Sequence, residues 1–437
     1  MHLPSCCRWF SLLTLVTAAS PAWAMTFEVF ESPLVESATI QKMNSNGTIF
    51  YGYATEGDDA EPRLLIFQEG GTTLLKDFFC MSVEAVSGDG SSIIFYGENF
   101  ERFFWTEEEE PISLKEKIGL EAEIDISSAT LNEDGSVIVG TISQTKWEAG
   151  SYWTTINGFR WTVTHGLELF ADHTKITAVS ADGATVAGNF YPIAGSITSH
   201  AFRWSEAGGM ERIPAFPVVE DAAEDHFESN WATDISPDGL VVYGTSRKGT
   251  ATFWGTNVVF SWSKAAGLSQ LDEVTNYTPS TLAEAGAAGG VVHTSSAVID
   301  AQTGKTGIWE VIAAAGGTGE VRGLEILHIS RDGSVLIGNG QLYVDNEPKE
   351  WVSWIIRDYP VPVVQPAIEM VPLDDETMRL VWSPQPGVRH VLQVHNPDGS
   401  WTDLATHDAS STEIGPYTYE VAVEDAARYY RVVATKL

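Results

Sequence analysis

Ala178-Val179-Ser180-Ala181-Asp182-Gly183-Ala184-Thr185-Val186-Ala187-Gly188 is the stretch that decides the fold. Alternating apolar residues on both sides of its Ser-x-Asp-Gly core predict two strands. Asp-Gly tolerates the positive φ of a tight turn, so the two strands are expected to form a hairpin. The terminal glycine, Gly188, allows close approach of another backbone.

This pattern recurs along most of the chain. Clear copies centre on Asp89-Gly90, Asp134-Gly135, Asp238-Gly239 and Asp332-Gly333, a looser copy on Asn46-Gly47, and a degraded copy ends in Gly289-Gly290-Val291-Val292. The turn glycines of successive units lie 43 to 56 residues apart. Seven units therefore span residues 27 to 356, which is the periodicity of a repeat architecture.

Each unit continues with an aromatic strand and a shorter apolar strand, as in Ala201-Phe202-Arg203-Trp204. Four strands in each of seven units predict an all-β fold, a seven-bladed β-propeller. The recurring tryptophans are expected to pack between blades: Trp105, Trp161, Trp204, Trp262 and Trp354. The last unit lacks a fourth strand, and Phe27-Glu28-Val29-Phe30 is expected to supply it and so cover an open sheet edge.

The paired motifs, with the signature His200-Ala201-Phe202-Arg203-Trp204, resemble the HAF-type extracellular repeat family. The resemblance covers about residues 27 to 356 and implies a bacterial, exported, propeller-like array. It implies no agreed activity, so it assigns no catalytic residue.

A smaller second domain is predicted after the repeats. Residues 357–366 read as a proline-rich linker, and 367–437 carry short alternating segments separated by Pro, Gly and Asp. These segments resemble a compact fibronectin type III module, a small antiparallel β-sandwich with Trp382 in its core. The expected domains are thus a signal peptide (1–24), the propeller (25–356), the linker and the sandwich.

Composition and processing signals narrow the compartment and the partners. The chain has 437 residues and a formal net charge of −34, which repels phosphate backbones and argues against nucleic-acid binding. Residues 1–24 combine a short basic start, an apolar run and Ala22-Trp23-Ala24, as secretory signal peptides do. We therefore expect export to the periplasm, the cell surface or the medium, with no transmembrane segment. Cys80 alone remains after cleavage, and its apolar neighbours predict a buried, inert thiol.

Candidate binding residues come from insertions on the propeller face opposite the Asp-Gly turns. The insertions are 143–157, 189–199, 245–257 and the inter-blade stretch 214–233. They carry aromatic residues outside the repeat pattern, together with acidic residues: Trp147, Trp153, Tyr191, Trp231, Trp254, Asp221 and Asp225. Variable loops on a rigid scaffold often form binding sites, although packing within the loops or a solvated acidic loop would also explain these residues.

The functional prediction follows from what the motifs lack. The sequence has no zinc-type Cys pair, no His-Glu-x-x-His, no Gly-x-Ser-x-Gly and no EF-hand loop, so no cofactor and no metal are expected. We expect an exported, monomeric, non-catalytic protein whose propeller face recognises a glycan or protein ligand. Two alternatives stay open: a secreted polysaccharide hydrolase or lyase that uses carboxylates on that face, and a structural cell-surface repeat protein.

Overall fold

The structure is a computed structural model, and almost all of its regular structure is β. It describes residues 25–30, 37–55, 61–68, 71–148, 151–192, 198–216, 229–248, 256–274, 291–294, 296–300, 304–317, 321–331, 333–344, 347–359, 368–372, 377–382, 388–395, 400–408, 417–422 and 430–436. The signal-peptide prediction (1–24) lies outside these ranges. Nine small antiparallel sheets form within the described ranges.

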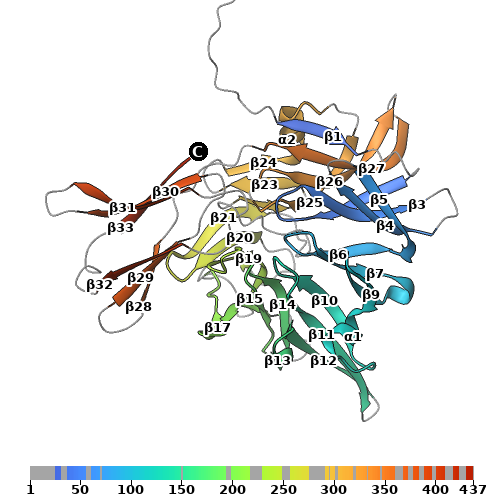
Figure 1. Cartoon of the computed structure of the whole chain (residues 1–437), viewed down its shortest axis with the longest axis horizontal. Helices are drawn as coiled ribbons and strands as arrows, with labels where there is room; N and C mark the ends of the chain where they lie inside the picture. Colours follow the sequence, from blue (N-terminus) through green and yellow to red (C-terminus); the bar gives the residue numbers. More distant parts are fainter. Residues whose placement is uncertain are drawn as a thin grey trace, which may run out of the picture.

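Seven of these sheets follow one another around a common centre in the order of the repeats (Figure 1). Sheet 1 is β2 (Ser37–Met43), β3 (Ile49–Thr55), β4 (Arg63–Gln68) and β5 (Gly71–Phe79), and sheet 2 is β6 (Ser82–Val86), β7 (Ser92–Tyr96), β8 (Arg102–Thr106) and β9 (Glu109–Ser113). Sheet 3 is β10 (Asp125–Leu131), β11 (Val137–Glu148), β12 (Ser151–Thr162) and β13 (Gly166–Asp172), and sheet 4 is β14 (Thr174–Val179), β15 (Thr185–Phe190), β16 (His200–Ser205) and β17 (Gly209–Arg212). Sheet 5 is β18 (Asn230–Ile235), β19 (Val241–Lys248), β20 (Thr256–Ser263) and β21 (Gly267–Val274), and sheet 6 is β22 (Val291–Thr294), β23 (Ala297–Asp300) and β24 (Gly304–Gly307). Sheet 7 is β25 (Val321–Ile329), β26 (Leu336–Val344), β27 (Glu347–Arg357) and β1 (Thr26–Val29).

The predicted pairing of the first strand with the last repeat is confirmed. β1 runs antiparallel to β27, with Phe27 opposite Ile356 and Val29 opposite Trp354. It occupies the outer position of sheet 7, which the last repeat leaves empty.

The Ser-x-Asp-Gly turns are built by their own side chains. In sheet 4, Ser180 Oγ accepts a hydrogen bond from the Thr185 amide at 2.9 Å and donates one to Asp182 Oδ1 at 2.6 Å. Asp182 Oδ1 also accepts from the Ala184 amide at 3.0 Å, and Gly183 has φ of 72°. The same arrangement recurs at Ser87 and Ser236. The sequence signature therefore encodes a turn whose Ser and Asp side chains form their hydrogen bonds within the turn itself.

Sheet 6 departs from the sequence-based expectation. The degraded repeat predicts a turn glycine at Gly290, but the hairpin joins Thr294 to Ala297, so the unit starts later than expected. The third strand, β24, carries no aromatic residue, and the place of the fourth strand is taken by a helix, α2 (Ile308–Ala314), whose Ile308, Val311 and Ile312 pack into the core of sheet 7. A helical apolar face buries the surface that the missing strand would have covered.

The repeat tryptophans pack into the cores between sheets, as expected. Trp105, Trp262 and Trp354 are buried, and Trp161 and Trp204 are half-buried against neighbouring clusters. Two short helical segments, η1 (Glu98–Phe100) and α1 (Leu114–Ile118), flank sheet 2. Cys80 is buried, and burial raises the pKa of its thiol to about 12, which fits the predicted inert role.

The C-terminal residues form two three-stranded sheets. One contains β28 (Ile368–Pro372), β29 (Thr377–Trp382) and β32 (Tyr417–Ala422), and the other contains β31 (Trp401–Asp408), β30 (Val388–His395) and β33 (Tyr430–Lys436). Both sheets contribute to one hydrophobic cluster, in which Trp382 is buried as expected beside Leu380 and Leu392.

Candidate functional site

A cavity of about 170 Å³ lies where the first strands of the sheets converge. Each sheet's first strand contacts the first strand of the next, from β2 to β18 and again from β22 through β25 to β2. The cavity occupies the end of this central channel near the Asp-Gly turns. Its charged and polar lining includes Lys42, Ser45, Glu133, Asp234, His328 and Arg331.

A recurring β-bulge determines which residues face this cavity. Five first strands shift register three residues before the Ser or Asn of the turn: after Ile40, Val83, Ile176, Ala232 and Ile326. The residue that follows each bulge lines the cavity, which places Lys42, Asp234 and His328 at equivalent positions of sheets 1, 5 and 7. Bulges commonly redirect side chains in this way near functional sites.

The bulged residues themselves connect neighbouring sheets. Gln41 Oε1 accepts a hydrogen bond from the Val83 amide at 2.7 Å, and Thr177 Oγ1 donates one to the Ala232 carbonyl at 3.1 Å. These bonds hold adjacent first strands at a fixed spacing, so the cavity lining rests on rigid elements.

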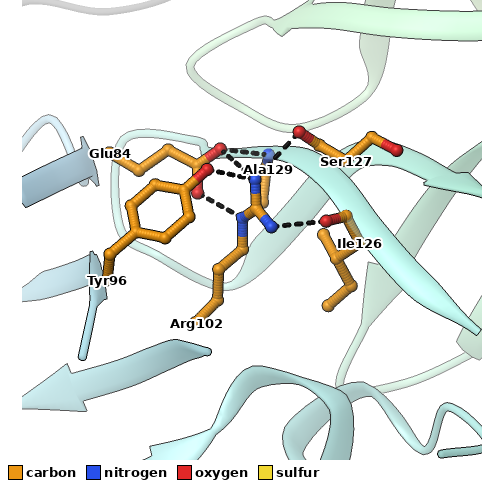
Figure 2. Close-up of polar contacts among 6 residues, drawn as sticks. All are labelled: Glu84, Tyr96, Arg102, Ile126, Ser127 and Ala129. Atoms are coloured by element: carbon orange, nitrogen blue, oxygen red, sulfur yellow. Dashed lines mark hydrogen bonds and ion pairs between the residues drawn. The ribbon is translucent and has the colours of Figure 1, made fainter. Parts of the chain in front are cut away.

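Figure 2 shows the most polar of these contacts, around the bulged Glu84 of sheet 2. Glu84 forms an ion pair with Arg102 Nε at 2.5 Å and accepts a hydrogen bond from the Ala129 amide of sheet 3 at 3.2 Å. Arg102 also donates to the carbonyls of Ile126 and Ser127. The Glu84 carboxylate therefore stabilises the interface between sheets 2 and 3.

The electrostatics of the cavity centre on Lys42. Burial lowers the pKa of Lys42 to about 8, and the negative charges of Glu84 and Asp234 oppose that decrease. Lys42 therefore exchanges between ammonium and amine near neutral pH, whereas an exposed lysine stays charged.

Two histidines around the channel stay neutral at that pH. Burial, together with the Lys42 charge, lowers the pKa of His328 to about 3. Burial also lowers the pKa of His293, on β22, to about 4, with a further decrease from Lys42 and an opposing contact to the Thr294 carbonyl. His293 Nε2 is buried with no hydrogen-bond partner among the described residues. Both imidazoles can therefore donate or accept a hydrogen bond in their neutral form.

A polar network narrows the channel at the Asp-Gly end. Glu133 forms an ion pair with Arg331 and accepts a hydrogen bond from Ser45 Oγ at 2.9 Å. These residues occupy the x position of their Ser-x-Asp-Gly turns. Their backbones also join successive turns: Arg331 N donates to Ser45 O at 2.7 Å, Ser45 N to Gly88 O at 2.8 Å and Glu133 N to Ala181 O at 3.2 Å. A Cβ at Gly88 would lie 1.6 Å from Glu133 Oε2, so a side chain at this position would have to displace the Glu133 carboxylate from the network.

Of the binding residues expected from the sequence, none that the structure describes lines this cavity. Trp231 is expected in an inter-blade insertion, but it is half-buried within β18, the first strand of sheet 5. Trp147 and Trp153 are expected in a loop, but β11 and β12 continue through them as one long hairpin, because the Thr-rich, β-branched sequence sustains pairing. Tyr191 is half-buried just after β15, with Lys175 Nζ 5.4 Å from its ring centroid. Trp254, Asp221 and Asp225 lie outside the described residues.

The cavity residues were not predicted from the sequence, because the prediction used the positions at which the repeats agree and the cavity residues lie at a position where the repeats differ. A comparison of the repeats position by position would have found them. Two residues before the turn Ser or Asn, the units carry Lys42, Ala85, Thr130, Ala178, Asp234 and His328. Charged or titratable residues in a column that otherwise holds small residues are the detectable signal.

Metal and membrane sites are not found in the part of the chain that the structure describes. Within those ranges, no group of three or more His, Cys, Asp or Glu residues is arranged to hold a metal ion. No helix of the described part is long and apolar enough to cross a membrane.

No protein-family model and no curated protein matches the sequence. Among solved structures, the chain resembles an acylaminoacyl peptidase in complex with Z-Gly-Gly-Phe-chloromethyl ketone, at 12% identity and a TM-score of 0.47, over 82% of this chain and 59% of that one. It also resembles the Pyrococcus horikoshii acylaminoacyl peptidase, at 11% identity and a TM-score of 0.44, over 82% of this chain and 60% of that one. A third similar structure is the β-propeller domain of the Trilobed protease from Pyrococcus furiosus, at 12% identity and a TM-score of 0.35, over 80% of this chain and 90% of that one.

These comparisons correct the functional prediction. The three solved structures named above are peptidases or part of a protease, which runs against the prediction of a non-catalytic binding protein; at 11–12% identity and TM-scores below 0.5 they assign no activity to this chain. The chain spans about three-fifths of the two acylaminoacyl peptidases, at 59% and 60% of their lengths. The fold is all-β and propeller-like.

Proposed function

We propose that the chain is a hydrolase whose catalytic centre is the channel cavity around Lys42. The observation that carries this proposal is the position of Lys42: it follows a β-bulge, lines a cavity deep in the fold and has a pKa of about 8. A lysine tuned to this range is a suitable general base near neutral pH.

The proposed reaction needs one group that accepts a proton and one negative charge that stabilises this group once it is protonated. The neutral Lys42 amine takes a proton from a water molecule, which attacks the substrate carbonyl. The tetrahedral adduct then collapses: the bond from the carbonyl carbon to the leaving nitrogen or oxygen breaks, and the Lys42 ammonium gives its proton to the leaving amine or alcohol. The negative charge of Asp234, one of the two carboxylates that stabilise charged Lys42, favours the ammonium formed in the first step. Neutral His328 lines the same cavity and would hydrogen-bond to the substrate without competing for the proton above pH 4.

The carboxylates of the cavity favour an amide or ester substrate over a glycoside. Glycoside hydrolysis uses two carboxyl groups that face each other across the bond. Of the acids that line this cavity, Glu133 is paired with Arg331, which makes Asp234 the single carboxylate proposed to act in catalysis. Acyl transfer needs one base and a polarised carbonyl, which this set of residues can provide.

A substrate panel tests this proposal. Purified protein is assayed against peptide nitroanilides, nitrophenyl esters and soluble polysaccharides, alongside Lys42→Met. Lys349→Met is the matched control, because Lys349 is exposed on β27, away from the cavity. We expect acyl substrates to be cleaved by the wild-type and the Lys349→Met proteins and to be cleaved at least ~100-fold more slowly by Lys42→Met. Equal rates in Lys42→Met and the wild type would refute the role of Lys42.

The proposal extends to architecture and location. Seven sheets in the order of the repeats support a seven-bladed ring, and the shared cluster around Trp382 supports a fibronectin III-like sandwich. The Ser-x-Asp-Gly and Phe-Arg-Trp signatures support membership of the HAF-type repeat family and export through residues 1–24. N-terminal sequencing of the protein recovered from the periplasm and the medium tests the export step, with Met25 expected as the first residue.

A further inference from the structure

A second cavity, of about 300 Å³, lies where the chain passes from sheet 1 to sheet 2. It is separate from the channel cavity and shares no lining residue with it. Apart from Pro111 its large apolar lining residues are phenylalanines, and its charged lining residues are all acidic. We call it the Phe103 groove, and its residues are Asp77, Phe78, Phe79, Phe95, Gly97, Glu98, Phe103, Glu110 and Pro111.

The aromatic wall of the Phe103 groove is held in place by packing. The rings of Phe95 and Phe103 stack with centroids 5.8 Å apart and an interplanar angle of 25°. A Cβ at Gly97 would lie 2.6 Å from a Phe103 ring carbon, so this glycine lets the ring lie against the backbone. Phe78 and Phe103 both pack on the core cluster between sheets 1 and 2. The wall is therefore preformed.

The backbone beside the groove is strained in an unusual way. Asn99 and Phe100, directly after Glu98, have φ angles of 56° and 59°, in the left-handed region that bulky residues avoid. Phe100 is 70% exposed, so this strain is not offset by burial of its ring. Strained backbone of this kind concentrates at ligand sites.

All the charged side chains that line the groove are negative. Asp77, Glu98 and Glu110 are exposed, and within the described part of the chain no ion pair involves any of them. Among the described side chains, no Lys or Arg lines the groove. The carboxylates are not grouped as metal ligands, since no such group occurs among the described residues.

We propose that the Phe103 groove binds organic ammonium cations. A cation with methyl or aromatic substituents buries apolar surface against the phenylalanines, whose ring faces attract positive charge. The surrounding carboxylates add long-range attraction without demanding the desolvation that a metal ion requires. A neutral apolar ligand would gain from the rings but not from the three acids, and an anion would be repelled.

Choline and its neutral isostere 3,3-dimethyl-1-butanol test this proposal on the full chain. They differ by a positive nitrogen in place of a carbon, so the comparison isolates charge at constant shape. Binding is followed by the shift of the Gly97 amide resonance in titrations. Choline is expected to bind at least ~5-fold more tightly than the alcohol, and its affinity should fall as salt is raised.

Two variants locate the site, and a third is the matched control. Glu98→Gln and Phe103→Leu should each weaken choline binding by about 3-fold to 10-fold. Glu108→Gln removes an acidic charge near Glu110 that does not line the groove, and it should leave the affinity unchanged. Because Glu98 is exposed, its variant keeps the fold even if Phe103→Leu does not. Equal affinity for choline and the alcohol, equal loss in Glu108→Gln, or no Gly97 shift at ~100 mM choline would each overturn the proposal.

Discussion

Glu133 and Arg331, from turns of sheets 3 and 7, form an ion pair across the Asp-Gly end of the central channel. Both side chains are largely buried, with 16% and 11% of their surfaces exposed. Ser45 of sheet 1 donates to the same carboxylate, so three sheets meet in one polar network. The network therefore narrows the channel at this end.

Removal of one partner of this pair should destabilise the protein strongly. Glu133→Ala or Arg331→Ala leaves the other charge buried, with an expected loss of about 2–4 kcal/mol in the free energy of unfolding. The double variant should lose clearly less than the sum of the two single losses, since neither charge then lacks its partner. Urea unfolding of the four proteins measures the coupling, and strictly additive losses would show that the pair contributes nothing.

The recurring glycine within the second strand of the repeat, Gly140 of β11, is predicted to be irreplaceable for steric reasons. A Cβ at Gly140 would lie 2.0 Å from the Ser128 carbonyl oxygen on the paired strand, and backbone cannot move aside cheaply. Gly140→Ala should therefore cost about 3 kcal/mol.

Gly119→Ala is the matched control for this substitution. Gly119 has a φ of 72°, and nothing lies within 4 Å of the position that an added methyl group would take, so only conformational strain of about 1 kcal/mol is expected. Thermal unfolding ranks the two variants. A Gly140→Ala protein as stable as Gly119→Ala would contradict the close approach of β10 and β11.

Acid should destabilise the fold in a window set by the two buried histidines. His293 and His328 have folded-state pKa values of about 4 and about 3, below the unfolded value of 6.5. The unfolded chain therefore binds more protons as the pH falls below 6.5, and stability decreases until the folded pKa is reached. Urea midpoints between pH 7 and pH 4.5 should fall steadily, and less steeply in His293→Gln. Identical pH dependence in the wild type and this variant would show that His293 does not contribute.

The contrast between what the sequence predicted and what it did not has a physical origin. Local chemistry determines the repeat. Ser180 and the Ala184 amide both donate hydrogen bonds to Asp182, and Gly183 adopts the positive φ of the turn. The same motif recurs along the chain. The pairing of Phe27 with Ile356 was predictable because one unit lacked a strand that the N-terminal segment could supply.

The site depends on long-range geometry instead. Lys42 and His328 act on one another only because β-bulges in two sheets that are far apart in the sequence turn both side chains toward the same channel. No local motif encodes that convergence. The helix α2 was missed for a related reason, since most members of the apolar cluster around Ile308 and Val311 belong to sheet 7, outside their own repeat.

The pH dependence of hydrolysis is the most direct test of the central claim that Lys42 is the general base. The rate constant kcat/KM is measured from pH 6 to pH 10 on the best acyl substrate of the panel, for the wild type and for Lys349→Met. Because the base acts as the neutral amine, activity should rise with pH through an apparent pKa near 8, the value that burial imposes on Lys42. Lys42→Met should lose that rise together with the activity. The absence of acyl hydrolysis in the wild type, or a rise near pH 8 that persists in Lys42→Met, would contradict the account.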